Sequence, residues 1–168
     1  MVLIKVRSVR AALAGAALAV SACASEPAGL SPEQQAVFDR PVDAELVVVA
    51  ARNAMRYETV KITAPAGSTV RLVIDNSTTT SPAMVHNVLV VGDTLEATVE
   101  RVGRAALGVP ENVPDDPAVL TATPLAGPGE RAAVVFEMPA PGVYTFVCTY
   151  PGHYRVMRGR LVSTPPAS

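Results

Sequence analysis

The stretch Cys148–Met157 reads Cys-Thr-Tyr-Pro-Gly-His-Tyr-Arg-Val-Met and brings three kinds of metal-binding side chain into ten residues. Cys148 offers a thiol, His153 an imidazole and Met157 a thioether, in the spacing C-x4-H-x3-M. The chain has one other histidine, His86, which lies 62 residues before Cys148 and is followed by Asn87. A short loop therefore offers three potential ligands, and a remote segment offers a fourth.

Each of these four side chains has an ordinary structural explanation when it is taken alone. A single cysteine is most often a small buried hydrophobe, and a methionine fills gaps in a core. Together, however, a thiolate, two imidazoles and a weakly bound thioether make the ligand set of a blue-copper electron-transfer site. We therefore predict one copper ion bound by His86, Cys148, His153 and Met157. These ligands would also accept zinc, and selection between the two metals in cells depends on their supply.

The local sequence explains how one loop could supply three ligands. Cys148 ends a predicted strand, so a rigid sheet would hold its sulfur. Pro151-Gly152 turns the chain and lets His153 return to the same metal. Met157 would then approach along the axis, just before the last strand begins. A site held by separate strands has its geometry fixed before the metal arrives. The surroundings of the metal then barely change between oxidation states, and this suits electron transfer.

Residues 1–22 are predicted to be a signal peptide. A basic start, a short apolar run and a small-residue cleavage region follow one another, which is the pattern of a secretory signal. The apolar run is too short to span a bilayer comfortably. The basic residues are Lys5, Arg7 and Arg10, and the apolar run is Ala11–Val20.

The end of this segment, Val20-Ser21-Ala22-Cys23, resembles the lipobox of bacterial lipoproteins, in which the cysteine is lipidated and becomes the first mature residue. This predicts a lipid anchor on Cys23 and an exported protein held at the periplasmic or other extracytoplasmic face of a membrane. Ordinary cleavage is the alternative, because Ala22-Cys23-Ala24 also fits the A-x-A pattern. With Cys23 lipidated or removed and Cys148 assigned to the metal, we expect no disulfide.

Composition narrows the class of partner. The chain from Cys23 onward has 146 residues, enough for one domain with a full core. The signal peptide holds three of the 14 Lys and Arg residues and none of the 15 Asp and Glu residues, so the mature net charge is −4. A mildly acidic domain without a basic run argues against nucleic acid as a partner. We expect a monomer that meets other redox proteins and reaches the membrane through its lipid.

Short apolar strands separated by Gly and Pro turns dominate the chain from residue 45, without alternation of strands and helices. This predicts an all-β fold, a single antiparallel-rich sandwich or barrel over residues 45–163. A lipidated N-terminus, tether and short helix precede it over 23–44, and a tail follows over 164–168. Residues 70–75 alternate apolar and polar side chains, which predicts one buried face. The strands are expected over 45–51, 57–64, 70–75, 88–91, 132–138, 143–148 and 160–163.

Two helices are predicted beside the strands. Ser31-Pro32 offers a cap and a proline at the first helical position, and Gln34 stands where a capping box would place it. A second helix is expected over residues 93–107, with Asp93 as its cap. Its apolar side chains recur at helical spacing, and Gly108 and Pro110 follow its end. The apolar residues are Leu95, Val99, Val102 and Ala106.

The chain resembles the cupredoxins, and among them azurin and the auracyanins. The resemblance rests on His86-Asn87 and on the loop from Cys148 to Met157, which is close to the azurin loop. The helical insertion over 93–107 is also azurin-like, and the likeness covers roughly residues 46–162. It implies a Greek-key β-sandwich or barrel with one short helical insertion. Val85 stands where azurin has glycine, and the azurin disulfide is absent.

The resemblance also implies roles for neighbours of the ligands. Asn87 would direct its backbone N–H at the Cys148 sulfur and brace the ligand loop with its side chain. The N–H of Tyr150 would be a second donor to that sulfur, and such bonds raise the reduction potential. In the family the edge of the later histidine reaches the surface in an apolar patch that docks redox partners. The matching residues here are Met84, Tyr150, Pro151 and Tyr154.

The residues are compatible with three classes of function to different degrees. The ligand set favours a type 1 copper protein that carries single electrons between exported redox partners. A copper-binding lipoprotein that handles the metal without a redox role could use the same residues. A Cys-His enzyme is disfavoured, because no oxyanion motif is apparent and Met157 would have no purpose. A larger copper enzyme would need a second domain or more histidines.

Overall fold

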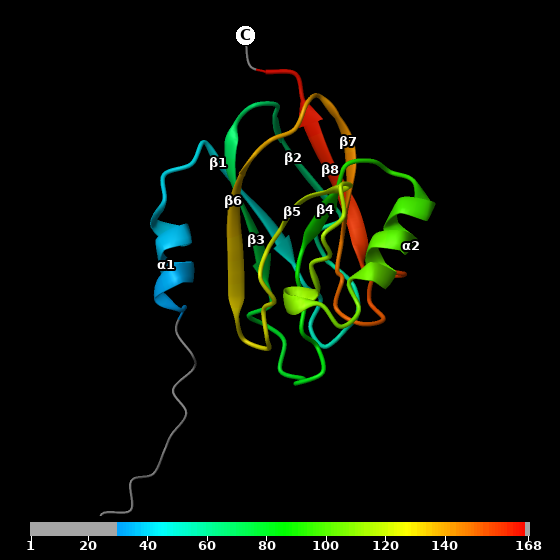
Figure 1. Cartoon of the computed structure of the whole chain (residues 1–168). Coiled ribbons are helices and arrows are strands. Elements are labelled where there is room, and N and C mark those ends of the chain that lie inside the picture. The colour runs from blue at the N-terminus through cyan, green and yellow to red at the C-terminus, as the bar shows by residue number, and fades with distance from the viewer. Residues whose placement is uncertain (1–29, 167–168) are drawn as a thin grey trace, which may run out of the picture.

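Two β-sheets packed face to face make up most of the computed structural model, which describes residues 30–166 (Figure 1). The first sheet has the strand order β1-β3-β6, and the second has the order β2-β8-β7-β4-β5. The strands are β1 (Ala44–Val49), β2 (Lys61–Pro65), β3 (Thr69–Asp75), β4 (Leu89–Val91), β5 (Val119–Ala122), β6 (Arg131–Glu137), β7 (Gly142–Val147) and β8 (Arg158–Thr164). The helices are α1 (Pro32–Asp39) and α2 (Glu96–Ala105), with a 3-10 turn at Pro110–Asn112.

The predicted all-β sandwich with a helical insertion is confirmed. Strand β1 runs parallel to β3 and β2 runs parallel to β8, while every other pairing of the two sheets is antiparallel. The predicted strands are all found within a few residues of their expected bounds, except that Tyr57 makes only an isolated bridge with Ala50 before β2 begins. Strand β5 was not predicted, because its four residues carry neither alternation nor branched side chains throughout.

The main core lies between the two sheets. Its fully buried side chains come from both layers, so the apolar faces of the strands explain why the sheets pack together. Cys148 and Met157 belong to this same cluster, which places the metal-binding loop at the edge of the core. The largest of the buried side chains are Phe146, Leu72, Ile74, Met157 and Leu161.

A second, smaller core lies between α2 and the outer face of β4 and β7. Val99 and Val102 of α2 pack there against the strand residues Leu89, Val91 and Val147, together with Tyr154 of the ligand loop. Strand β4 is therefore buried on both faces. Figure 1 shows α2 beside the β4-β7-β8 side of the second sheet.

The N-terminal helix α1 covers the outer side of the first sheet (Figure 1). Ser31 caps it as predicted, since its hydroxyl accepts the backbone N–H of Gln34 at 3.2 Å. Gln34 does not complete a capping box, however. Its side chain donates to the carbonyl of Ala133 at 3.3 Å and accepts the N–H of Ala133 at 2.8 Å. Because β6 is an edge strand, these bonds satisfy backbone groups that would otherwise be unpaired.

Strand β3 corrects the prediction of a single buried face. Its residues from Val70 to Ile74 are all buried, Arg71 included. The Arg71 guanidinium donates to the Glu45 carboxylate at 2.9 Å and to the carbonyl of Val37 at 3.1 Å, and also to the carbonyl of Arg40. A charged side chain tolerates burial when it is paired in this way. The polar side chain of β3 therefore binds the C-terminal end of α1 instead of facing solvent.

Helix α2 begins later than predicted. Leu95 stands at the cap position without a side-chain bond, and it is 63% exposed rather than part of the apolar face. Asp93 instead forms a turn before the helix, where its carboxylate accepts the N–H of Leu95 at 2.8 Å and the hydroxyl of Thr98 at 2.9 Å. Val99, Val102 and Ala106 are buried as expected.

Several predictions concern residues outside the described range. The signal peptide over 1–22, the lipid site at Cys23 and the tether that follows it all lie there, as do residues 167–168. Thr164, expected to begin the tail, is the last residue of β8. Over the described residues 30–166, no helix has the length and apolar character needed to cross a membrane.

Candidate metal centre

Three of the four predicted ligands converge at one point. Donor atoms of His86, Cys148 and His153 lie within 4.8 Å of one another, and all three residues are buried. Nδ1 of His86 lies 3.8 Å from the Cys148 sulfur and Nδ1 of His153 lies 3.5 Å from it, while the two nitrogens are 3.2 Å apart. Both rings therefore turn the same nitrogen toward the sulfur.

The separations suit a single metal ion. Bonds of about 2.0 Å to nitrogen and about 2.3 Å to sulfur, the lengths found in zinc sites, would separate donors by roughly 3.5–3.7 Å in a trigonal arrangement. The three distances in the structure lie around that range. Two imidazoles and one thiolate at these separations are the strong ligands of a type 1 copper site. The donor set thus fits one such ion.

The ligand loop is held by its own backbone bonds. Cys148 directly follows β7, and its N–H donates to the carbonyl of Met157 at 2.9 Å, while the N–H of Met157 donates to the carbonyl of His153 at 2.9 Å. Gly152 takes a positive φ of 85°, as the predicted Pro-Gly turn requires. Met157 is fully buried and directly precedes β8. The loop thus returns Met157 to the neighbourhood of Cys148.

The segment carrying His86 is held by a backbone bridge and by the side chain of Asn76, a residue that was not among the predicted site residues. His86 and Ala126 exchange two backbone hydrogen bonds, of 3.0 and 2.8 Å. The buried amide of Asn76 donates to the carbonyls of Met84, Ala126 and Gly127 at 2.8–3.1 Å. Asparagine is common in turns that follow a strand, so the sequence around Asn76 gives no sign that its side chain holds the His86 segment.

Asn87 links the two ligand-bearing segments, as the resemblance implies. Its side-chain oxygen accepts the backbone N–H of Thr149 at 2.9 Å, and its side-chain nitrogen donates to the Thr149 hydroxyl at 2.9 Å. Asn87 follows His86 directly and Thr149 follows Cys148 directly. All of these polar groups are buried. The network therefore sets the distance between the histidine and the cysteine within the protein itself.

The surroundings of the sulfur act on its pKa in opposite directions. Burial raises the pKa of the Cys148 thiol to about 11, while the backbone N–H groups of Asn87 and Tyr150 and the hydroxyl of Tyr57 counteract that rise. The two N–H donors are those implied by the resemblance; Tyr57 was not foreseen. Burial lowers the pKa of His86 to about 4, helped by the neighbouring His153, and burial lowers that of His153. At neutral pH the metal-free site holds neutral imidazoles, the form that binds a metal.

The lowered pKa of His86 predicts that the metal-free protein loses stability in acid. The pKa of His86 is lowered on folding, so the unfolded chain binds more protons between about pH 6.5 and 4, and stability should fall as the pH falls through that window. The loss should be on the order of 3 kcal/mol. Urea unfolding at pH 7, 5.5 and 4 would measure it. In His86→Gln the slope should be much flatter; an equal slope in both proteins would contradict the prediction.

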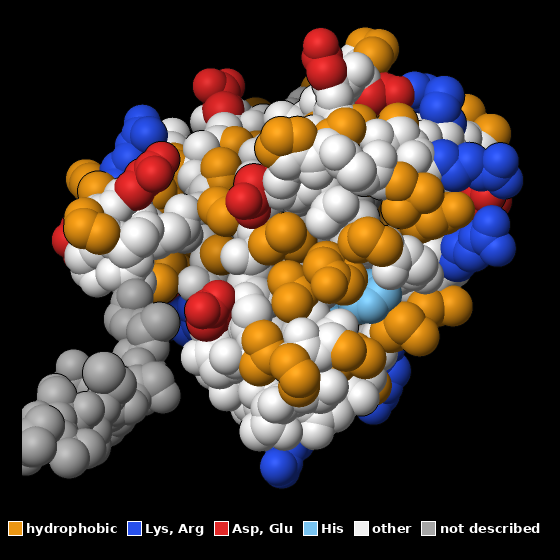
Figure 2. Space-filling view, turned by 60° about the horizontal axis from the view of Figure 1, so that its bottom comes forward, with side chains coloured by type: hydrophobic (Ala, Val, Ile, Leu, Met, Phe, Trp, Pro, Cys, Tyr) orange, Lys and Arg blue, Asp and Glu red, His pale blue; other side chains and the backbone are white. Residues whose placement is uncertain are grey.

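The predicted docking residues are exposed to different degrees. Figure 2 shows a small area of histidine surface surrounded by hydrophobic side chains on one face. His86 is fully buried, whereas 3% of the His153 surface is exposed. Pro151 is exposed, and Met84 and Tyr150 are half-buried. The expectation for Tyr154 is wrong, because only 5% of it is exposed. Its ring fills the space above Gly103 of α2, where an added Cβ would come within 2.3 Å of it.

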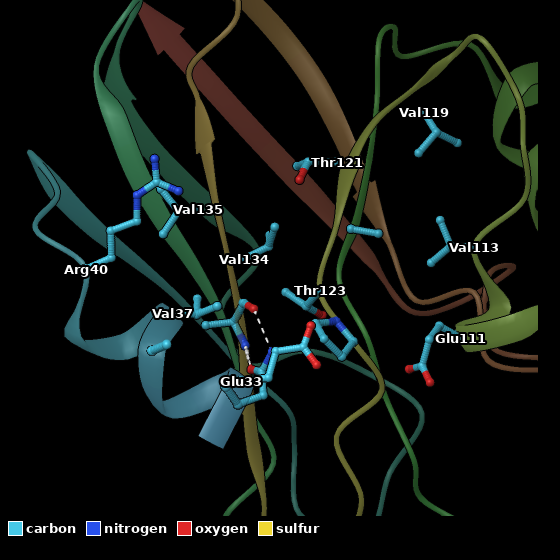
Figure 3. A pocket seen from close by; sticks show the side chains of 15 residues that line it. Glu33, Val37, Arg40, Glu111, Val113, Val119, Thr121, Thr123, Val134 and Val135 are labelled. Carbon is cyan, nitrogen blue, oxygen red and sulfur yellow. Dashed lines mark hydrogen bonds between the residues drawn. The ribbon is translucent and has the colours of Figure 1, made fainter. Parts of the chain in front are cut away.

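A hollow elsewhere on the molecule is unconnected with the metal ligands. A cavity of about 690 Å³ lies between α1, β5 and β6 (Figure 3), with valines such as Val37, Val119 and Val134 on its walls. None of His86, Cys148, His153 and Met157 lines it. The donor cluster is instead closed in by protein, as suits a bound ion.

Comparison with known proteins agrees with this geometry. Residues 44–163 match the family model of copper binding proteins of the plastocyanin/azurin family. Auracyanin-B of Chloroflexus aurantiacus is 34% identical over 156 residues, which cover 89% of this chain and 64% of that protein. Auracyanin-A of the same organism is 32% identical over 111 residues, covering 64% of this chain and 67% of that protein.

Solved structures show the same likeness. The structure of auracyanin B superposes with a TM-score of 0.68 and 32% identity, over 76% of this chain and 93% of that one. Reduced auracyanin from Roseiflexus castenholzii gives a TM-score of 0.65 and 30% identity, over 73% and 97% of the two chains. With the matched family model and the His-Cys-His cluster, these likenesses show that the chain belongs to the plastocyanin/azurin family of copper-binding proteins.

Proposed function

We propose that this protein carries single electrons through one type 1 copper ion. His86, Cys148 and His153 would be its strong ligands and Met157 a weak axial one. The observation that supports this most is the convergence of three buried donor atoms within 4.8 Å. The bound copper would supply a one-electron redox couple. Its relative auracyanin A is described as a blue copper protein.

The protein's own part is to keep the ligands in place and water away. Cys148 is held by the end of β7, and His86 by its bridge to Ala126. The Asn87–Thr149 bonds join the two segments, so little has to move when the charge at the site changes. The N–H groups beside the sulfur withdraw electron density from it, which favours the reduced state.

Partners and location are part of the proposal. Electrons would pass through the edge of His153, with Met84, Tyr150 and Pro151 as the apolar surface that meets a redox partner. Weak redox encounters use small interfaces, so a modest apolar patch is sufficient. We further propose a monomer exported to the periplasmic or extracytoplasmic side and tethered by a lipid on Cys23.

Copper loading combined with self-exchange tests the proposal. On titration of the mature protein with Cu(II) we expect one intense thiolate-to-copper band that saturates at one ion per chain. Mixtures of the oxidised and reduced protein should then show fast electron self-exchange by NMR line broadening. A strong band with slow exchange would favour metal handling without a redox role. The absence of a band would overturn the site itself.

A further inference from the structure

We propose that Tyr57 is a positioning residue of the copper site, holding the Asn87 backbone against the Cys148 sulfur through its buried hydroxyl. The inference rests on the proposed function and adds a residue to it. Tyr57 lies in the connection between β1 and β2, far from the ligands in sequence. Nothing in the ligand motif points to it.

The packing and backbone contacts of Tyr57 fix the direction in which its hydroxyl points. The residue is 3% exposed, and its ring packs on that of Phe146 with centroids 5.4 Å apart at 60°. Its backbone is held by the bridge to Ala50. From this position the hydroxyl donates to the carbonyl of Asn87 at 2.5 Å. A side chain fixed at both ends in a close-packed core can hold its partner in place.

Asn87 is thereby anchored at three points. Its N–H faces the Cys148 sulfur, its side chain bonds Thr149, and its carbonyl accepts the Tyr57 hydroxyl. Removing the hydroxyl should therefore loosen the Asn87 peptide, and with it the N–H that faces the sulfur.

The variant Tyr57→Phe tests this with little loss of volume. In the copper-loaded protein we expect a lower reduction potential and a thiolate-to-copper band at longer wavelength, because the Asn87 N–H is then held less firmly against the sulfur. In the metal-free protein the amide hydrogens of Asn87 and Thr149 should exchange roughly fivefold faster, the typical effect of one lost hydrogen bond. That second measurement needs no copper.

Tyr144→Phe is the matched control. The Tyr144 hydroxyl also donates to a backbone carbonyl, that of Ala140 at 2.8 Å, but in an exposed turn. It should leave the potential, the band and the Asn87 exchange unchanged. If Tyr57→Phe lowers stability yet keeps the wild-type potential and band, Tyr57 is only a core residue and the inference fails. If the wild type itself forms no blue band, the proposed function fails, while the exchange of Asn87 still decides whether Tyr57 positions it.

Discussion

Replacing Cys148 by serine is expected to abolish the intense visible band of the copper-loaded protein while the fold stays intact. The band requires a thiolate bound to copper, and a hydroxyl is a poor ligand for a soft site. Serine is close to cysteine in size, and the backbone bond from residue 148 to Met157 does not depend on the side chain. The visible spectrum after Cu(II) loading and the far-UV circular dichroism would be measured together.

Thr149→Ser is the neighbouring control for this experiment. It keeps the hydroxyl and the backbone N–H that bond Asn87, and it leaves the sulfur in place. The blue band should therefore persist in this variant. A band of undiminished strength in Cys148→Ser would show that the sulfur does not bind the copper, whatever the folded state of the protein.

The ligand residues could be predicted from sequence because they carry their chemistry in their side chains. Cys148, His153 and Met157 lie on one loop, and the chain has only one further histidine, His86. Ser31 was predictable for a similar reason, since a cap is a local bond. Such features need no knowledge of which distant segments meet.

The supporting residues could not be found in that way. Tyr57 follows a turn and looks in the sequence like any core aromatic residue. The role of its hydroxyl becomes visible only because Asn87, thirty residues later, folds into contact with it. Gln34 fits a capping box as well as it fits the edge of β6, and the packing of α1 on that edge decided between the two. Long-range contacts of this kind overrule local preference.

Tyr154 illustrates an error that one signal could have prevented. A tyrosine between two ligands suggests a surface loop, and the prediction placed it in the docking patch. Gly103, however, stands inside a helix, where glycine costs about 1 kcal/mol relative to alanine and often has a packing reason. The structure supplies that reason, because the Tyr154 ring occupies the space a side chain at Gly103 would need.

Gly159→Ala is expected to destabilise the protein by about 2–3 kcal/mol, at the upper end for overpacking a core. Gly159 lies opposite Phe146 in the pairing of β7 with β8, and a Cβ there would come within 2.2 Å of the Phe146 ring. That ring is fully buried and packs on Tyr57, so it cannot move aside without disturbing the residue that holds Asn87. Urea unfolding of the metal-free protein would measure the loss.

Gly92→Ala separates this effect from the general consequence of replacing a glycine. A Cβ at Gly92 would meet its nearest neighbours at an ordinary 3.6 Å, and neither Gly92 nor Gly159 has a positive φ. The control should therefore stay within about 0.5 kcal/mol of the wild type. Equal stability of the two variants would mean that Phe146 can shift freely and does not hold Tyr57 in place. A large loss of stability in Gly159→Ala alone would show that Phe146 cannot move aside. If the copper-loaded variant also shows a band shift in the same direction as that of Tyr57→Phe, then β8 helps to set the geometry of the copper site.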